Sequence, residues 1–428
     1  MPVRPIRALR YNMAGVVDLA AVLAPPYDII SAEEQDALYA RDANNVIRLE
    51  YGKQSAEDTP DNNRYTRARA AEARWREEGM LVLDATPGYY PHHQRFTWGG
   101  QPRVRRGFFA AVELQPFGEG AVLPHEWTLK GPKEDRLRLM RTCLTSYSPV
   151  FGLYDSRHTA LGELLARATT RDPVATAEGF GFNERLWRCD DLGLTEEITT
   201  ALATRQILIA DGHHRYETML ALRDTLRQTY PDAPATAAFN YAFMLLVDVS
   251  DPGLLLLATH RLLLLSSEML AGVCRQLCEG FQRETLTVTH PDEVTDLLAR
   301  QADAHAFIWY ANGAYTLLTA PKALRNGLPV LDVQMAQEGI IGPLLALDPA
   351  GDATVERNVR YTISPEQAVA RVDRGEVQAA LFLNPTPIAD VFTLAAAGVR
   401  LPQKSTYFYP KVPTGLVMHS LAPEVEVG

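Results

Sequence analysis

The stretch Ile207-Leu-Ile-Ala-Asp-Gly-His-His-Arg215 carries the strongest structural signal in the chain. Its four leading apolar residues predict a short buried strand. The Asp211-Gly212 pair predicts a turn, because glycine adopts positive φ without steric cost. Beyond the turn, apolar residues recur at helical spacing over 214–228, so the strand leads directly into a helix. The stretch therefore predicts one strand–turn–helix unit.

The side chains of this turn are suited to binding an anion. A helix N-terminus offers backbone N–H groups and the positive end of the helix dipole, and Gly212 lets a ligand approach the backbone closely. Arg215 is a bidentate donor to phosphate or carboxylate, while His213 and His214 add two titratable rings. The Asp211 carboxylate is suited to hold Mg²⁺ or to orient a hydroxyl. The structural alternative is that Asp211 caps the helix and Arg215 pairs with an acid elsewhere.

Strand and helix signals alternate along the rest of the chain, which predicts a mixed α/β fold. The β-rich stretches Gly88–Trp98 and Val104–Leu114 are joined by the turn Gly99-Gly100. The continuous apolar run Tyr241–Val249 indicates a buried strand, and Ser31-Ala-Glu-Glu34 is a capping box that opens a helix.

The length of 428 residues predicts two or three domains, at roughly 100–200 residues each. We expect an N-terminal α/β lobe over residues 1–147, a central lobe over 148–330 and a C-terminal α/β segment over 331–428. Polar motifs occur in all three parts, so we expect the parts to converge on one cleft.

Charge and composition exclude some classes of function. The 42 Lys and Arg residues against 52 Asp and Glu residues give a net charge of -10, which argues against nucleic acid as the main partner. A phosphorylated small molecule stays compatible, because it needs only a few local cations. Four cysteines without a CxxC pair fit a reducing compartment.

No segment predicts membrane insertion or secretion. The most apolar run, Gly253–Leu265, is interrupted by His260 and Arg261 and is shorter than the ~20 residues that a span requires. The N-terminal arginines are not followed by an apolar signal core. We therefore expect a cytoplasmic protein, and the sequence leaves its oligomeric state open, a homo-oligomer included.

A second polar motif, Leu123-Pro-His-Glu-Trp-Thr128, stands just before a predicted helix start. His125 and Glu126 could supply a metal ligand and a general base, although the pattern is not that of a zincin, because no second histidine follows one turn later. Lys130 and Lys133 at the helix start could hold a phosphate chain. The alternative for them is a solvated, charged helix face.

Two further motifs place polar groups in constrained positions. In Ala24-Pro-Pro-Tyr-Asp28, two prolines fix an extended loop and aim Tyr27 and Asp28 rigidly, unless the stretch is simply a turn. Arg261 interrupts an apolar run, and a buried arginine needs a partner anion, which either the protein or a ligand supplies. A structural salt bridge is the favoured interpretation for Arg261.

The segment Pro402–Lys411 combines cations, hydroxyls and aromatic rings between prolines. Lys404, Ser405 and Thr406 are similar to the end of a phosphate loop, but no glycine tract precedes them, so the segment is not a Walker A motif. Packing of the aromatic rings in the core is the alternative. No GxGxxG fingerprint follows any predicted strand, so a Rossmann dinucleotide site has no support.

Taken together, five motifs resemble an uncharacterised bacterial and archaeal family, the domain-of-unknown-function family one thousand and fifteen. They occur in the family's order and span nearly the whole chain. The motifs are APPYD (Ala24–Asp28), LPHE (Leu123–Glu126), ADGHHR (Ala210–Arg215), THR (Thr259–Arg261) and PQKSTYFYPK (Pro402–Lys411).

The ADGHHR turn also resembles the nucleotide-binding turn of the ParB/sulfiredoxin-like superfamily. Its members include CTP-binding ParB proteins, sulfiredoxin, and free-serine kinases that use ADP or ATP. The resemblance implies a nucleotide-binding core of this type, with Asp211, Gly212, His213 and Arg215 on the matching positions. His214 stands where the kinases have threonine. Because His213 stands where sulfiredoxin has its reactive cysteine, sulfinate chemistry has no support.

The resemblance therefore implies a Mg²⁺- and ATP- or ADP-dependent phosphotransferase for a small hydroxylated metabolite, with free L-serine as the best guess. A ParB-type nucleotide switch without turnover and a metal-dependent phosphate-ester hydrolase stay open. The kinases activate the substrate hydroxyl with a glutamate, for which Glu126 is the candidate. The candidate residues are Asp211, Glu126 and His125 for catalysis, with Asp211 also as metal ligand; Gly212, His213, His214, Arg215, Lys130, Lys133, Arg261, Lys404, Ser405 and Thr406 for phosphates; and Tyr27 and Asp28 in a substrate or structural loop.

Overall fold

The computed structural model describes residues 3–428 apart from 17, 129, 158, 267–268, 271–279, 346–354 and 356, and for 130–132 it describes the backbone alone. The chain folds into two compact units, and both are assembled from separate stretches of sequence. Unit 1 consists of Met1–Pro124, Thr128–Leu254 and Pro410–Gly428, and unit 2 of His125–Trp127 and Leu255–Tyr409. The expectation that three lobes converge on one cleft stays a prediction.

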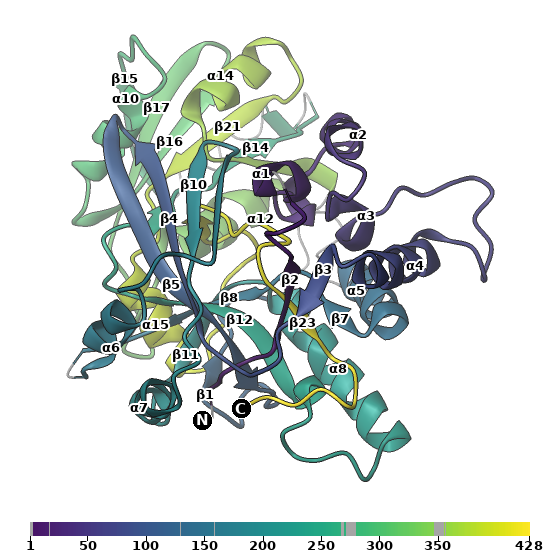
Figure 1. Ribbon diagram of the computed structural model, residues 1–428. Coiled ribbons are helices and arrows are strands. Elements are labelled where there is room, and N and C mark those ends of the chain that lie inside the picture. Colours follow the sequence, from purple (N-terminus) through teal and green to yellow (C-terminus); the bar gives the residue numbers. More distant parts are fainter. Residues whose placement is uncertain are drawn as a thin grey trace. The chain divides into compact units, whose positions relative to one another are not determined.

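A mixed sheet of nine strands, counted over the described residues, forms the centre of unit 1 (Figure 1). Most neighbours run antiparallel, but β8 and β12 are parallel, as are β6 and β11. The long blue hairpin in Figure 1 is β4 and β5, which confirms the two predicted β-rich stretches and their turn. The order is β6 (Val122–Leu123), β11 (Ile207–Asp211), β8 (Val150–Tyr154), β12 (Tyr241–Asp248), β5 (Gln101–Glu113), β4 (Tyr90–Trp98), β10 (Phe182–Leu186) and β9 (Ala175–Gly179), with β1 (Val3–Arg4) beside β5.

Three helices cover one face of this sheet and form the main core of unit 1. They are α6 (Leu161–Arg167), α7 (Leu192–Leu202) and α8 (His213–Thr229), and their apolar residues pack against β5, β8, β11 and β12. The predicted strand–turn–helix unit is confirmed as β11 followed by α8. Alternation of strands and helices in both units confirms the mixed α/β class.

The remaining elements of unit 1 come mainly from the N-terminal part of the chain. Helix α2 begins after Ser31, whose side chain and that of Glu34 form the predicted capping box. The helical elements are α1 (Leu19–Val22), η1 (Tyr27–Ile29), α2 (Ala32–Arg41), α3 (Ile47–Glu50), α4 (Arg64–Glu77), α5 (Lys130–Cys143) and η2 (Ala238–Asn240). A four-stranded sheet joins β3 (Leu81–Leu83), β2 (Ala8–Tyr11), β23 (Met418–Ser420) and β7 (Thr145–Ser146).

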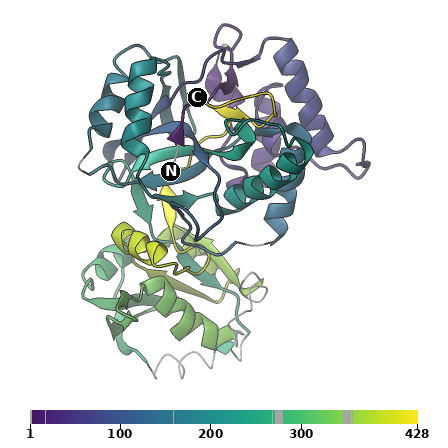
Figure 2. The same ribbon diagram turned by 90° about the horizontal axis from the view of Figure 1, so that it is seen from below.

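Unit 2 contains a six-stranded antiparallel sheet among its described residues, drawn in green in Figure 2. Helices α10 (Glu293–Ala299) and α14 (Pro365–Asp373) bury Val294, Leu298 and Ala368 against it. The strand order is β15 (Gln282–Leu286), β17 (Ala314–Pro321), β16 (Ala304–Ala311), β21 (Ala379–Leu383), β14 (His260–Leu263) and β20 (Val359–Thr362). The other elements are β13 (Leu255–Leu257) paired with β22 (Tyr407–Tyr409), β18 (Leu324–Arg325) paired with β19 (Leu328–Pro329), α11 (Asp332–Ala336), η3 (Gln337–Ile341), α12 (Gly342–Leu345) and α15 (Ile388–Ala396).

None of the helices in the described part of the chain combines the length and the apolar character that a membrane span requires.

The core of unit 1 predicts one stability effect. Phe108 on β5 is fully buried and packs edge-to-face against Tyr89 and Tyr154, with ring centroids 5.7 and 5.9 Å away. Phe108→Ala should lower the free energy of unfolding by about 3–5 kcal/mol, because it leaves a cavity. The partly exposed Phe180 is the control, and Phe180→Ala should change it by less than about 1 kcal/mol. Equal losses in chemical denaturation would contradict this assignment of the core.

Buried histidines predict a pH dependence of stability. His419 on β23 is fully buried, and burial lowers its pKa to about 4. The unfolded chain therefore binds a proton that the folded chain excludes as pH falls from about 6.5 towards 4, and stability falls with it. His419→Leu should reduce this slope by up to about 1.4 kcal/mol per pH unit, measured by denaturation at pH 5 to 6.5. His290→Leu, at an exposed position, is the control, and an unchanged slope for His419→Leu would refute the prediction.

Candidate functional site

The turn between β11 and α8 has a backbone conformation that requires glycine. Gly212 is the N-cap of α8 with φ 91°, in the left-handed region that other residues adopt only with strain. The pairing of β11 with β8 is irregular between Ile209 and Asp211, where Asp211 comes to lie opposite Phe151. Because Gly212 has no side chain, it cannot cap the helix as a serine or aspartate would. The sequence thus places Asp211 at the strand end, and the N-cap residue of the helix that follows makes no side-chain capping hydrogen bond.

Arg215 packs against this turn from inside the protein. Its guanidinium is buried, donates to the carbonyl oxygen of Pro149 and lies 3.8 Å from Asp211 Oδ1. A Cβ atom on Gly212 would lie only 3.0 Å from Arg215 Nε. Arg215 therefore pairs with Asp211 of the same turn, whereas the structural alternative had it pair with an acid elsewhere. Its role in binding phosphate stays a prediction.

Lys411, which is not among the predicted site residues, completes the group. Lys411 Nζ donates to Asp211 Oδ2 at 2.6 Å, and the two side chains are 14% and 23% exposed. Lys411 is 200 positions away in sequence, and no local pattern links it to Asp211. The one sequence feature that could have marked Lys411 as a candidate site residue is its place at the end of the Pro402–Lys411 motif. Asp211, Gly212, Arg215 and Lys411 are called the turn cluster below.

The two predicted histidines occupy the first positions of α8. His213 is buried, and His214 is half-buried. The backbone carbonyl of His214 accepts a hydrogen bond from Thr218 Oγ1 at 2.7 Å. Both residues therefore lie at the helix N-terminus, as predicted, and their ligand roles stay predictions.

The predicted Ala24–Asp28 loop lies near the turn cluster in the same unit. The ring of Tyr27 stacks against Arg136, whose Cζ lies 4.1 Å from the ring centroid. Burial raises the Tyr27 pKa to about 12, while the charges of Arg136 and Arg215 act in the opposite direction. Tyr27 is therefore within electrostatic reach of the turn, whereas Asp28 is exposed on η1.

Lys130 and Lys133 were predicted to bind phosphate, and the structure describes the side chain of Lys133 alone. Lys133 forms an ion pair with Glu217 of α8, and Thr128 Oγ1 donates to the same carboxylate at 2.6 Å. This contact joins α5 to the first turns of α8. The side chain of Lys130 lies outside the described residues.

The other predicted residues form a second cluster within unit 2. His125 Nε2 and Thr406 Oγ1 are 2.9 Å apart, and Glu126 Oε1 accepts the Lys404 N–H at 2.7 Å. Lys404 adopts φ 55°, and Ser405 Oγ donates to the carbonyl oxygen of Pro402. These contacts fold the 402–406 loop onto the His125-Glu126 pair.

Arg261 belongs to the same cluster in unit 2. Its buried guanidinium donates to the carbonyl oxygens of Thr259 and Lys404. Burial lowers its pKa, while Tyr361 and Glu126 act in the opposite direction. Arg261 is thus held by protein groups, with Glu126 as the nearby anion, and a phosphate role for it stays a prediction.

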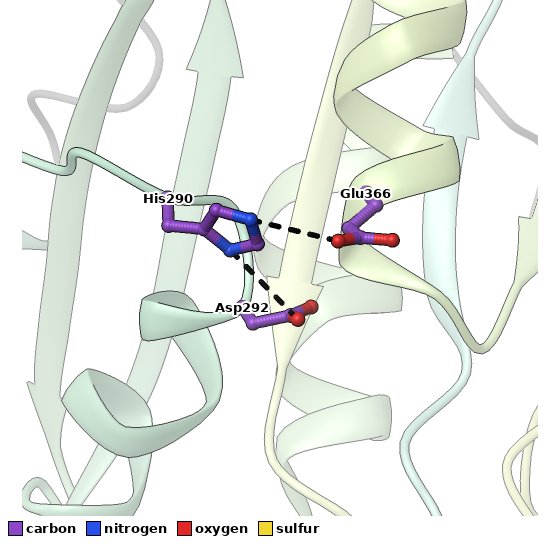
Figure 3. A group of neighbouring side chains, drawn as sticks. All are labelled: His290, Asp292 and Glu366. Carbon is purple, nitrogen blue, oxygen red and sulfur yellow. Dashed lines mark ion pairs between the residues drawn. The ribbon is translucent and has the colours of Figure 1, made fainter.

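Among the described residues, Asp211 does not belong to a group of three or more potential metal-ligating side chains, and its role as a metal ligand stays a prediction. Magnesium prefers several oxygen ligands, but Asp211 Oδ2 faces the ammonium of Lys411. Figure 3 shows the metal-capable group found among the described residues, the exposed His290, Asp292 and Glu366 in unit 2. The two ring nitrogens of His290 face different carboxylates, Nδ1 that of Asp292 at 3.8 Å and Nε2 that of Glu366 at 3.6 Å. The histidine therefore lies between two acidic side chains. Mg²⁺ carried by nucleotide phosphates would enter as part of the substrate.

Comparison with known proteins gives one family and several distant structures. The model of the family described as "Protein of unknown function (DUF1015)" matches residues 3–334. No curated protein matches the sequence. Free serine kinase in complex with AMP is 15% identical, with a TM-score of 0.37, and the match covers 72% of this chain and 92% of that one. A variant of that kinase in complex with ADP is 12% identical with a TM-score of 0.37, and the match covers 72% of this chain and 92% of that one. A conserved hypothetical protein from Pyrococcus furiosus is 15% identical with a TM-score of 0.37, and the match covers 72% of this chain and 95% of that one. At this distance, the ligands remain properties of those proteins.

The geometry of the turn predicts the effect of adding one methyl group. Gly212→Ala should lower the free energy of unfolding by about 1–2 kcal/mol, because alanine is strained at this φ and its Cβ presses on the Arg215 guanidinium. Gly162→Ala is the matched control, because Gly162 lies within α6 and its Cβ would meet no atom within 4 Å. The control should be neutral or slightly stabilising. Equal stability of the two variants in urea denaturation would be inconsistent with the described turn.

Proposed function

Because the chain belongs to the DUF1015 family, whose description assigns no reaction, we propose its function from the turn cluster itself. The proposal is a nucleotide-dependent phosphotransferase for a small hydroxylated metabolite, with free L-serine as the best guess. The observation that carries it is the 2.6 Å contact of Lys411 with Asp211 at the start of α8. This contact combines a cation, a carboxylate and a helix N-terminus, which are the groups that phosphoryl transfer requires.

The cationic side of the cluster would bind the phosphates. The N-terminus of the 17-residue helix α8 carries a partial positive charge of about half a unit. Lys411 and Arg215 add two cations against the single carboxylate of Asp211, so the cluster has an excess of positive charge. Gly212 would allow a phosphate oxygen close to the backbone. Lys411 would turn from Asp211 towards the transferred group and neutralise its charge.

The carboxylate of Asp211 would act on the acceptor. Once Lys411 pairs with phosphate, Asp211 Oδ2 becomes available to orient the substrate hydroxyl and accept its proton. The hydroxyl oxygen then forms a bond to the terminal phosphorus, and the bond from that phosphorus to the nucleotide's bridging oxygen breaks. The nucleotide leaves one phosphate shorter, and the proton passes from Asp211 to solvent. The role of Glu126 as the base, expected from the sequence, stays a prediction.

A single assay separates this proposal from its two alternatives. Purified protein is incubated with Mg²⁺ and either ATP or ADP, together with a panel of amino acids and polyols, and followed by ³¹P NMR. A new phosphomonoester signal supports the kinase. Free phosphate without a new ester would favour a phosphate-ester or nucleotide hydrolase. Nucleotide binding without any conversion would favour a switch of the ParB type.

Asp211 provides the sharpest mutational test of the proposal. Asp211→Asn keeps the shape of the side chain but removes its charge and its capacity to accept a proton, so turnover should fall by at least about 100-fold. The protein should still fold, because Asp211 lies at a turn and not in the apolar core, but its thermal midpoint should fall, because Arg215 and Lys411 lose a counter-charge. Asp224→Asn, which removes an exposed carboxylate of α8, should keep full turnover. Full activity of Asp211→Asn would refute the central assignment.

A further inference from the structure

A row of polar side chains crosses three neighbouring strands of the unit 1 sheet. Arg105 on β5 lies opposite Gln94 on β4, and Gln94 lies opposite Glu184 on β10. Directly paired residues point to the same face of a sheet. All three side chains are buried, with Arg105 only 1% exposed. This sheet face thus carries a buried cation beside the buried Gln94 and Glu184.

Glu184 does not neutralise this cation directly. One of its oxygens lies 2.6 Å from His92 Nε2, and the other accepts a hydrogen bond from Gln94 Nε2 at 2.8 Å. Over the described residues, Arg105 forms no ion pair within 4 Å of a carboxylate. Glu184 and Asp251 stabilise its charge only from a greater distance, and burial lowers the Arg105 pKa to about 10.

Two polar atoms of the row lack a hydrogen-bond partner. Arg105 Nη1 donates to the carbonyl oxygen of Pro410, but Arg105 Nη2 is buried and has no partner among the described residues. The same is true of Gln94 Oε1, although Gln94 Nε2 also reaches the carbonyl oxygen of Lys411 at 3.1 Å. A buried donor and a buried acceptor left without partners are unfavourable, and they point to a ligand that supplies both partners.

Phe151 and Lys411 connect this row of side chains to the turn cluster. The guanidinium of Arg105 stacks on the Phe151 ring at 4.9 Å, and Phe151 is the strand partner of Asp211. The peptide that Arg105 and Gln94 hold carries Lys411, whose ammonium reaches Asp211. Phe151, Asp211 and the Arg105 guanidinium therefore share one face of the sheet, with Lys411 between the row and the turn.

We propose that Arg105 and Gln94 form the inner end of the turn-cluster site and bind an oxyanion of its ligand. Arg105 Nη2 donates to the oxyanion, which supplies the missing counter-charge. Gln94 Oε1 accepts from a hydroxyl or amino group beside the oxyanion. The inference rests on the proposed function, and the oxyanion is either a phosphate of the nucleotide or a carboxylate of the acceptor.

The test measures binding of three probes by isothermal titration calorimetry: inorganic phosphate, ADP, and L-serine in the presence of ADP. Arg105→Met should weaken at least one of them tenfold or more, and Arg105→Lys should restore part of the loss, because it returns the charge. Arg103→Met is the matched control, since it removes the same charge two positions earlier on β5, and it should bind like the wild type.

The pattern of loss identifies the source of the oxyanion. Weaker binding of phosphate and ADP assigns it to the nucleotide, whereas loss confined to L-serine assigns it to the acceptor. A purely structural role for Arg105 would lower the thermal midpoint without changing affinity in the folded variant. Wild-type affinity of Arg105→Met for all three probes, or no probe bound by the wild type, overturns the inference. The proposed function fails separately, if no phosphomonoester forms although a probe binds through Arg105.

Discussion

The contact between Lys411 and Asp211 is the interaction on which the arrangement of the candidate site depends. Its 2.6 Å ion pair ties the segment that begins at Pro410 to the end of β11, and so fixes a cation at the start of α8. Without it, the Asp211 carboxylate at the strand end would keep the Arg215 guanidinium, 3.8 Å away, as an opposite charge. The two side chains are only 14% and 23% exposed, so the lysine would leave the carboxylate readily only for another anion. Such a pair suits a site where a phosphate replaces the carboxylate as the lysine's partner.

The surroundings of a buried arginine distinguish the Arg261 cluster of unit 2 from the Arg105 row of unit 1. In unit 2, Arg261 donates to two carbonyl oxygens and has Glu126 as a nearby anion, so the protein itself satisfies the cation. In unit 1, Arg105 has one carbonyl partner and an idle Nη2, and Glu184 is already engaged by His92 and Gln94. The protein therefore satisfies the buried arginine of unit 2, whereas Arg105 in unit 1 keeps one buried donor without a partner among the described residues. An incomplete buried cation is the stronger sign of a ligand.

Local sequence was sufficient to predict several helices, strands and turns, but not the long-range contacts between their side chains. The turn at Gly212, the hairpin of β4 and β5 and the capping box at Ser31 were predictable, because each depends on residues a few positions apart. Arg105 and Gln94 were not, because an arginine and a glutamine in a β-rich stretch ordinarily face solvent. Only the register between strands places them in one buried row. The contact of Lys133 with Glu217 could not be predicted from local sequence either, because the two residues are 84 positions apart.

The sequence by itself determined the strand–turn–helix unit, its need for glycine and the presence of Asp211, His213 and Arg215 around it, since short-range sterics and hydrogen bonding act within a few residues. It also determined a net charge of -10, which argues against a nucleic-acid partner but does not give the position of any site. The tertiary structure decided that Lys411 faces Asp211, that His125 and Glu126 fold against the 402–406 loop, and that Arg105 lies buried with one donor idle. These outcomes depend on which distant segments pack together, and that is set by burial of apolar surface over the whole chain.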